Sequence, residues 1–507
     1  MPMLMPRTTL YCWHRRIGLI VFVAIMAWAL SGLSHPIMSR INPRPVMMSP
    51  PVSVGSMAKL LPLSSALSLN AIDEFEQVQL INIDDTSFYR VEHGGDTSYI
   101  DASSGQRANL NDIDYAKQLA RYYLGDTANK IVSVELVSAF NEDYLYINRF
   151  LPVYKVTFDR PDNMRAYVEV STGRLATLID DRKALVGWVF RQLHSWVFIK
   201  NPWLRTIAMS VMLIAGMGLS LVGLLMAWRG RGNRADKKSA SKGGVSVWHR
   251  RLGIGFGVLM LTFSFSGLYH LLNKPVIAPP PKSPPSTFFT SGNLTLDWPT
   301  VADVAGAEYF IRGNLVMVDG MPFFRLVLAA PNVTGKPAKS AGAEHHSNKH
   351  VSRGGKLIYI NAGSSQLCAH CERKHALNLA EYYSGAASGD KSLDEGQVEK
   401  ITRFSSDYGF INKRMPVHAV NLGHAPEAGG EAQTTLYVET ATGALASRAS
   451  SSSRLEGWSF SYLHKWHFFD PLSKVLRDIL LIITTLAIAV LCLLGAMVSF
   501  KSGPDKA

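Results

Sequence analysis

Six histidines occupy matching positions in the two halves of this 507-residue chain: His14, His35 and His194 in the first half, and His249, His270 and His464 in the second. A neutral imidazole is a good axial ligand for haem iron, and two imidazoles from facing helices can hold a b-type haem without a covalent link. The matched histidines are therefore the residues at which we expect chemistry, and the chemistry they favour is electron transfer through bound haem.

Four of these histidines mark the ends of a repeated apolar segment. WHRRIGLIVFVAIMAWALSGLSH runs from Trp13 to His35, and WHRRLGIGFGVLMLTFSFSGLYH runs from Trp248 to His270 without a gap. The 21-residue spacing between the histidines of each copy corresponds to roughly 30 Å of helix, the thickness of a hydrocarbon core. The middles of the two copies have diverged while the histidines still match, which favours ligation over simple anchoring at the interface.

Arginines and glycines beside the histidines also suit haem. Haem propionates would pair with the arginines that follow the first histidine of each copy: Arg15, Arg16, Arg250 and Arg251. Nearby glycines would let a flat macrocycle or another helix approach closely: Gly18, Gly32, Gly253 and Gly267. We expect His14 and His249 to lie at one face of the membrane, and the other four matched histidines to lie at the opposite face.

The elements that must position these residues are membrane spans. Hydrophobic residues make up 47% of the chain and charged residues only 18%, which is apolar for a soluble protein. Four uncharged runs have spanning length, 17–34, 206–228, 252–269 and 479–500. The first resembles a signal peptide in its basic flank, but its near-copy at mid-chain cannot be one, so we interpret it as an uncleaved anchor.

Basic residues predict the orientation of the spans. The segment between the second and third runs, RGRGNRADKKSASKGGVSVWHRR, holds eight Lys or Arg and one Asp. The positive-inside rule places this loop and both termini in the cytoplasm, and two large segments outside it. The net charge of +13 thus partly reflects topology, and it requires no nucleic-acid partner.

We expect seven consecutive regions: 1–39, the N-terminus and first span; 40–200, a first external domain with an interfacial helix; 201–228, the second span; 229–251, the basic loop; 252–272, the third span; 273–474, a second external domain with an interfacial helix; and 475–507, the fourth span and tail.

The two external segments resemble each other. DYLYINRFLPVY from Asp143 matches DYGFINKRMPVH from Asp407, and YVEVSTGRLATL from Tyr167 matches YVETATGALASR from Tyr437. We infer an internal duplication of a span–domain–span unit. Helical LARYYLG and LAEYYSG segments, and short strands separated by Thr-Gly turns, predict α+β domains with a helix on an antiparallel sheet.

Cysteine and histidine also gather in the second external segment. Cys368 and Cys371 form a CxxC pair, and nearby histidines could join them in a zinc, copper or iron site: His345, His346, His350, His370 and His375. In an oxidising compartment a disulfide beside a solvated loop is favoured instead. Glu372 follows the pair where a covalent haem site would need histidine.

Taken jointly, the HRRIG and HRRLG starts, the SGL ends, the LHxWxF elements and the YVxxxTG strands resemble the PepSY-associated transmembrane family of bacterial inner-membrane proteins. The resemblance implies a membrane α-helical fold of four duplicated spans with two periplasmic PepSY-like α+β domains. Some members of that family look like ferric-siderophore reductases with two b haems, which implies a ferric chelate as substrate. The resemblance also implies that His14 and His249 ligate an inner haem, and that two or more of His35, His270, His194 and His464 ligate an outer one. The long external domains, the histidine-rich loop and the CxxC depart from the pattern.

We therefore expect a haem-containing inner-membrane oxidoreductase that carries electrons outward to a periplasmic ferric-siderophore. No nucleotide or hydrolase motif is visible, so flavin or nicotinamide would sit on a separate cytoplasmic or membrane electron donor. Two alternatives remain: a periplasmic peptide-binding or protease-regulating protein whose histidines only anchor spans in the lipid bilayer, and a metal-handling protein without haem.

Overall fold

The computed structural model describes residues 6–229, 244–277, 282–329, 355–385, 394–405, 407–424 and 433–501. The chain folds into two compact units. The membrane unit comprises Met1–Asn42, Asp181–Pro279 and Ser452–Ala507, and the sheet unit comprises Pro43–Asp180 and Pro280–Ser451. Each unit therefore collects residues from both halves of the sequence.

Four long helices form the membrane unit: α1 (Arg7–Ile41), α5 (Pro202–Arg229), α7 (Val245–Asn273) and α11 (Lys474–Lys501). Each contains a stretch long and apolar enough to cross a membrane: Thr8–Met38, Pro202–Arg229, Val245–Asn273 and Lys474–Phe500. These stretches exceed the ~20 residues that a bilayer requires. The four predicted spans are confirmed as apolar helices.

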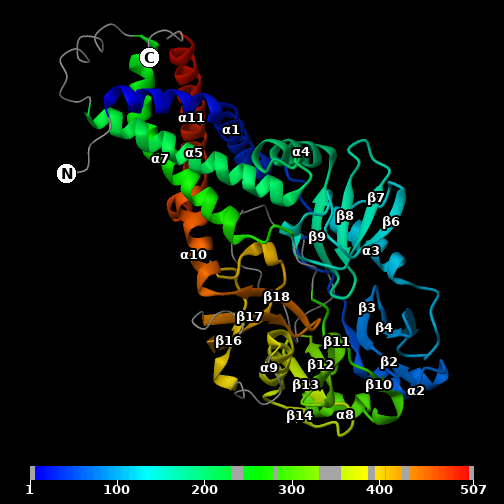
Figure 1. Ribbon diagram of the computed structural model, residues 1–507. Coiled ribbons are helices and arrows are strands. Elements are labelled where there is room, and N and C mark those ends of the chain that lie inside the picture. Colours follow the sequence, from blue (N-terminus) through cyan, green and yellow to red (C-terminus); the bar gives the residue numbers. More distant parts are fainter. Residues whose placement is uncertain are drawn as a thin grey trace. The chain divides into compact units, whose positions relative to one another are not determined.

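Helix packing places α1 and α7 across the bundle from each other. Each of them packs against both α5 and α11 (Figure 1). The middle of the bundle is apolar, with Val21, Ile25 and Ala29 of α1 buried near Met260 of α7. Residues on α1 and α7 can therefore face one another through the centre of the bundle.

Shorter elements lead into α5 and α11. Helix α4 (Asp181–His194) packs against α1. Helix α10 (Ser451–Ser459) continues into a π-helical turn, η7 (Phe460–His464), which packs against α7, and a 3₁₀ turn, η8 (His467–Phe469), follows. These are the aromatic LHxWxF elements of the sequence, and each brings one histidine to the bundle.

An eight-stranded antiparallel sheet crosses the sheet unit in the order β14-β13-β12-β11-β3-β4-β5, with β1 paired to β11. Its strands are β1 (Gly55–Ser56), β3 (Gln77–Ile83), β4 (Thr86–His93), β5 (Asp96–Asp101), β11 (Tyr309–Val318), β12 (Met321–Leu328), β13 (Leu357–Asn361) and β14 (Leu367–Cys368). Strands β3 and β11 pair directly, so both predicted external segments share one sheet, which the two separate domain ranges did not anticipate.

Small elements cover one face of that sheet: η1 (Met57–Lys59), α2 (Leu63–Leu69), β2 (Glu74–Phe75), β10 (Phe289–Thr290), η3 (Ser291–Asn293) and α8 (Trp298–Ala305). Strands β2 and β10 form a two-stranded sheet. Fully buried Trp298 of α8 packs against Phe324 of β12, and its indole donates to the Tyr89 hydroxyl at 2.5 Å. One core thus joins elements from both halves.

Two four-stranded antiparallel sheets complete the unit. The first contains β6 (Ile131–Val137), β7 (Val153–Phe158), β8 (Arg165–Glu169) and β9 (Arg174–Ile179); the second contains β15 (Val398–Ile401), β16 (Val417–His424), β17 (Gln433–Glu439) and β18 (Ala444–Ala449). Helix α3 (Asp112–Leu124) packs on the first and α9 (Cys371–Ser384) on the second. Short 3₁₀ turns occur at η2 (Tyr146–Asn148), η4 (Glu395–Gln397) and η5 (Phe410–Asn412).

The predicted helix ends and turns are confirmed. Helix α3 begins at Asn111, whose side chain accepts from the Asp114 amide at 3.0 Å, and it ends at Gly125 in the left-handed region. Gly173 and Gly443, in the two Thr-Gly turns, have φ values of 69° and 71°. Only glycine adopts such angles without steric cost, so the chain can turn from one strand to the next at these positions without strain.

Candidate functional site

One histidine pair lies between α1 and α7. The ring centroids of His14 and His249 are 6.1 Å apart, with their planes at 58°. A ring nitrogen lies about 1.15 Å from the centre of a five-membered ring, and a metal–imidazole bond is about 2.0 Å, so two imidazoles on opposite sides of one metal ion would have centroids about 6.3 Å apart. The observed separation therefore suits a shared metal ion. We call these residues the α1–α7 pair.

Glycines on the neighbouring helices leave room for the α1–α7 pair. A Cβ atom added at Gly495 would lie 2.8 Å from Cε1 of His249, and one added at Gly223 would lie 3.0 Å from Cε1 of His14. Gly223 is on α5 and Gly495 is on α11, so each ring lies directly against the backbone of an adjacent helix. No larger residue fits at these positions without moving an imidazole.

The Nδ1 atoms of the α1–α7 pair face helix backbones. Nδ1 of His249 is 3.1 Å from the carbonyl oxygen of Leu491. A carbonyl oxygen only accepts, so Nδ1 carries the proton and Nε2 is left as a free acceptor. Nδ1 of His14 is buried and lacks a hydrogen bond of normal geometry within the described residues, although the backbone of Leu219 approaches it. Leu219 and Leu491 each precede the contacting glycine by one helical turn.

A second histidine pair lies where α4 and η7 end. The ring centroids of His194 and His464 are 6.3 Å apart and their planes are at 84°. This separation again equals the value of about 6.3 Å expected for two imidazoles trans to one metal ion. One residue comes from each half of the sequence, as in the first pair. We call these residues the α4–η7 pair.

Two buried serines fix the orientation of the α4–η7 pair. Ser31 Oγ is 2.9 Å from Nδ1 of His194, and Ser266 Oγ is 3.1 Å from Nδ1 of His464. Each serine donates its only proton to the carbonyl three residues earlier, at 3.0 Å for Ser31 and 3.2 Å for Ser266. In the tautomer that carries its proton on Nδ1, each histidine donates to the serine Oγ, and Nε2 is left unprotonated. Metal-ligating histidines usually have such a partner for the second ring nitrogen.

Aromatic side chains surround the α4–η7 pair in a matching way. Trp28 stacks on Trp196 with centroids 5.2 Å apart, and Phe263 stacks on Trp466 at 5.6 Å. Trp196 and Trp466 have positive φ values of 51° and 56°. A bulky residue is rarely found there, so the same strained turn two residues after each histidine brings the indole back against α1 or α7.

This environment keeps the α4–η7 histidines neutral. Desolvation by the surrounding side chains lowers the pKa of His194 to about 4 and that of His464 to about 3. Repulsion between the two imidazoles adds to the effect. Both rings are therefore uncharged at neutral pH, which is the protonation state that a metal ligand needs.

The other two predicted ligands do not form a ring pair with each other within the described residues. His35 is exposed on the surface of α1 and makes no ring contact among the described residues, although it lies close enough to His194 to influence its protonation. His270 hydrogen-bonds through Nδ1 to the carboxylate of Glu456, and its ring stacks on Phe460 with centroids 3.8 Å apart. Of the four histidines predicted for this end, the structure therefore brings together His194 and His464.

The two histidine pairs are at different depths in the bundle. Ser31 contacts the α4–η7 pair and is 17 positions after His14 in α1, which corresponds to about 25 Å along the helix. The apolar core around Val21 and Ile25 lies between these levels. The spacing is shorter than the roughly 30 Å expected for histidines at opposite ends of the span.

The predicted propionate partners remain available at the α1–α7 pair. Arg15 is half-buried and the other three arginines are exposed, namely Arg16, Arg250 and Arg251. The guanidinium of Arg251 is 5.5 Å from the centre of the Trp248 ring. Within the described residues none of the four makes an ion pair, so they can meet an anionic group next to His14 and His249.

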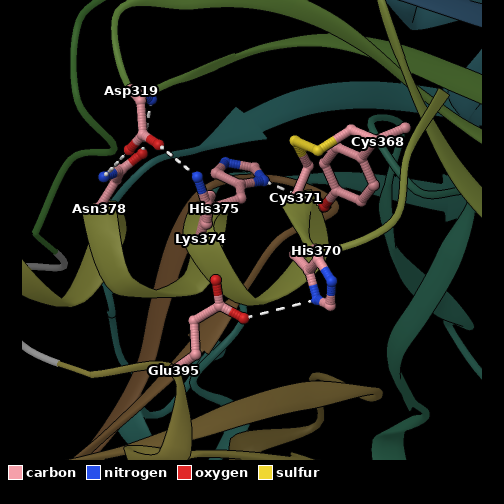
Figure 2. The surroundings of a disulfide bond; sticks show 9 residues. Asp319, Cys368, His370, Cys371, Lys374, His375, Asn378 and Glu395 are labelled. Carbon is pink, nitrogen blue, oxygen red and sulfur yellow. Dashed lines mark hydrogen bonds and ion pairs between the residues drawn. A yellow bond between two sulfur atoms is a disulfide. The ribbon is translucent and has the colours of Figure 1, made fainter. Parts of the chain in front are cut away.

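The CxxC pair forms a disulfide between Cys368 and Cys371 (Figure 2). Of the two alternatives, the disulfide that the sequence favoured is therefore observed, and the cysteines provide no thiolate ligands for a metal. His370 is exposed, 3.6 Å from Glu395, whereas His375 is buried and lies 3.2 Å from the Tyr359 hydroxyl. Across the described part of the chain, no three His, Cys, Asp or Glu side chains form a metal-binding group. His345, His346 and His350 lie outside the described residues.

Sequence reasoning missed the side chains that support the histidines. These are Ser31 and Ser266, Gly223 and Gly495, and the tryptophans Trp196 and Trp466. The serines begin the SGL ends of the repeated segment and the tryptophans belong to the LHxWxF element, so the repetition itself was a usable signal. The glycines lie in apolar spans without any local pattern.

Comparison with known proteins identifies the family. The model of the family described as the PepSY-associated TM region matches residues 12–502. The curated proteins include no match to this chain. Because the matched range includes all four long helices and both histidine pairs, the chain belongs to the family of the PepSY-associated transmembrane region.

Proposed function

We propose that this protein is a haem-containing oxidoreductase of the bacterial inner membrane that moves electrons outward and reduces a periplasmic ferric-siderophore. The observation that carries the proposal is the geometry of the two histidine pairs. Each pair joins one residue from each half of the chain, at centroid distances of 6.1 and 6.3 Å. Both separations are close to the value expected for two imidazoles that share one metal ion.

Haem is the group that these residues fit best. His14 with His249 and His194 with His464 would each supply two neutral imidazoles, which is a complete axial set for b-type haem. Zinc would need further ligands, and the described residues contain no such group near either pair. Bound haem would supply reversible one-electron chemistry at each level of the bundle.

The chain's own residues orient the ligands and control their surroundings. Ser31 and Ser266 hold the imidazoles of the α4–η7 pair through Nδ1, while Leu491 does the same for His249. Arg15, Arg16, Arg250 and Arg251 would neutralise propionates at the α1–α7 pair. At the other pair the nearest candidate is Lys465, whose ammonium lies 4.7 Å from the Phe460 ring centre.

The duplication and topology support the direction of transfer. Matching serine–histidine contacts and matching strand orders in the two small sheets support a duplicated unit with two periplasmic PepSY-like domains. The basic loop and arginine-rich helix starts place the α1–α7 pair at the cytoplasmic side. Electrons would then enter from a cytoplasmic or membrane donor and leave near the α4–η7 pair. Reduction favours iron release because siderophores bind the hard ferric ion far better than ferrous.

Absorption spectra of the purified full-length protein and of three histidine variants test the proposal. The wild type should show a Soret band and sharp reduced α and β bands. His14→Ala and His194→Ala should each lose about half of the haem, while His35→Ala, which changes an exposed histidine of the same helix, should keep both haems. A folded, colourless wild type would overturn the proposal, and stoichiometric zinc or copper would favour metal handling instead.

A further inference from the structure

A row of polar side chains crosses one face of the eight-stranded sheet. Residues directly opposite each other in neighbouring antiparallel strands lie on the same face. The register aligns six such residues in successive strands from β5 to β13: Tyr99, Arg90, Gln79, Asn314, Arg325 and Tyr359. The row is symmetric about the β3–β11 pairing, with an arginine and a tyrosine on each side.

The arginine in the first half of the row is fully neutralised. Nη2 of Arg90 lies 2.6 Å from Asp112, its Nη1 lies 2.5 Å from Glu92, and the Tyr99 hydroxyl donates to Asp112 at 2.7 Å. Arg90 is buried, so these bonds offset the cost of removing its charge from water.

The matching arginine in the second half has no carboxylate. Glu372 stands where Asp112 stands, seven residues before the repeated Leu-Ala, but it bonds Lys400 at 2.6 Å and His418 at 3.1 Å. Arg325 is only 6% exposed, and its Nε has no hydrogen-bond partner within the described residues. A buried guanidinium therefore remains without a counter-charge.

A second arginine faces the same space. Arg312 of β11 lines a small cavity together with Arg325, and its Nη2 lies beside Gly173. Burial lowers the pKa of Arg312 by more than the weaker attraction to Glu169 raises it. It forms no ion pair with any described residue.

Neighbouring charges do not compensate these two arginines. Arg414 lies 3.1 Å from Glu169 and 2.7 Å from Glu439, and Arg174 also bonds Glu439. These two arginines and two glutamates balance one another. Arg312 and Arg325 therefore leave a local excess of two positive charges.

The cavity presents hydrogen-bond donors and no carboxylate. Its polar lining consists of Gln79, Ser171, Thr172, Arg312, Asn314 and Arg325, and its free space is about that of one water molecule. Gln79 is 2% exposed, and its Oε1 is without a partner among the described residues. Because amide oxygen and nitrogen can exchange places, the Gln79 amide can direct its NH₂ group to the same space.

We propose that this cavity is a binding site for a small monovalent anion of the size of chloride, held by Arg312 and Arg325 with donors from Gln79 and Ser171. The cavity is too small for a phosphate or a whole siderophore group. It lies among β3, β11 and β12 and the turn after β8, so a bound anion links strands from both halves of the chain. The site is independent of the histidine pairs.

Thermal unfolding of the full-length protein in detergent, with chloride replaced by gluconate at constant ionic strength, tests the site. The wild type should gain about 3–6 °C in Tm between zero and 100 mM chloride, along a saturating curve. Arg325→Gln and Arg312→Gln should lose this dependence. Arg448→Gln, which removes an exposed arginine of β18, should retain it.

The wild-type titration alone can refute the site if the variants do not fold. A Tm that does not change when chloride replaces gluconate, or that rises linearly without saturation, would overturn the proposal. An equal chloride effect in Arg325→Gln and the wild type would overturn it as well. Haem content is unaffected in all of these outcomes, which separates them from a failure of the histidine pairs.

Discussion

Substitution of Gly495 by alanine is expected to remove the haem of the α1–α7 pair without harming the fold. The added Cβ would lie 2.8 Å from Cε1 of His249, whereas carbon atoms in contact are about 3.5–4.0 Å apart. The imidazole must therefore move by about 0.7–1.2 Å. Such a shift stretches the 3.1 Å contact between Nδ1 and the Leu491 carbonyl and displaces Nε2, the nitrogen through which His249 would hold the haem.

Folding itself should not suffer from this change. Alanine is a better helix former than glycine by about 0.5–1 kcal/mol, so α11 gains helical propensity. Gly218→Ala on α5 is the control, because its added Cβ would meet no heavy atom within 4 Å. A loss of haem in Gly495→Ala alone would then report on ligand geometry.

Haem content per protein, measured from the absorption of the purified variants, is the appropriate assay. Gly495→Ala should retain about one haem where the wild type and Gly218→Ala retain two. If Gly495→Ala binds both haems with an unchanged spectrum, then His249 does not ligate in the position that the structure shows, and the reasoning fails.

Three further predictions concern other parts of the molecule. Ser31→Ala should weaken haem binding at the α4–η7 pair about 10–100-fold, whereas Ser34→Ala should not. Haem transfer to an acceptor protein measures this difference, and equal transfer rates for the two variants would contradict the role of the Ser31–His194 contact. Burial lowers the pKa of His375 from 6.5 to about 3, so its stabilising effect is complete above pH 6.5 and is lost as the pH falls toward 3. Denaturant titrations between these pH values should show that His375→Phe reduces the slope of the unfolding free energy against pH by about 1.4 kcal/mol per pH unit relative to the wild type. The same slope in both proteins would count against this role of His375. Arg414→Gln leaves buried Glu169 and Glu439 poorly paired and should lower the free energy of unfolding by about 3–5 kcal/mol. Thermal unfolding should show little change for Arg448→Gln, and similar Tm values for both variants would refute this prediction.

The sequence alone predicted the features that depend on local pattern. Four apolar runs, the glycine-ended helices α3 and α9, and the Thr-Gly turns all follow from hydropathy, capping and turn preferences. The structure has the predicted helix or turn at each of these places. Repetition of the histidines was equally visible, because the two copies could be compared within one chain.

Features that depend on packing between distant segments could not be predicted. Nothing in the sequence indicates that Gly223 and Gly495 lie against His14 and His249, because the contact depends on how α5 and α11 rotate in the bundle. The close approach of the His194 and His464 rings depends on the turns at Trp196 and Trp466, where bulky residues adopt an unusual φ. The β3–β11 pairing joins residues more than 200 positions apart, beyond the range of any local pattern.

The most direct test of the central claim is the haem stoichiometry and electron paramagnetic resonance spectrum of wild-type protein purified from cells with ample haem. We predict two haems per chain, both low-spin with two imidazole ligands. His249→Ala and His464→Ala should each remove one of the two low-spin signals from the spectrum. Well-folded protein without haem, or haem that both variants retain unchanged, would contradict the claim that paired histidines from the two halves of the chain bind it.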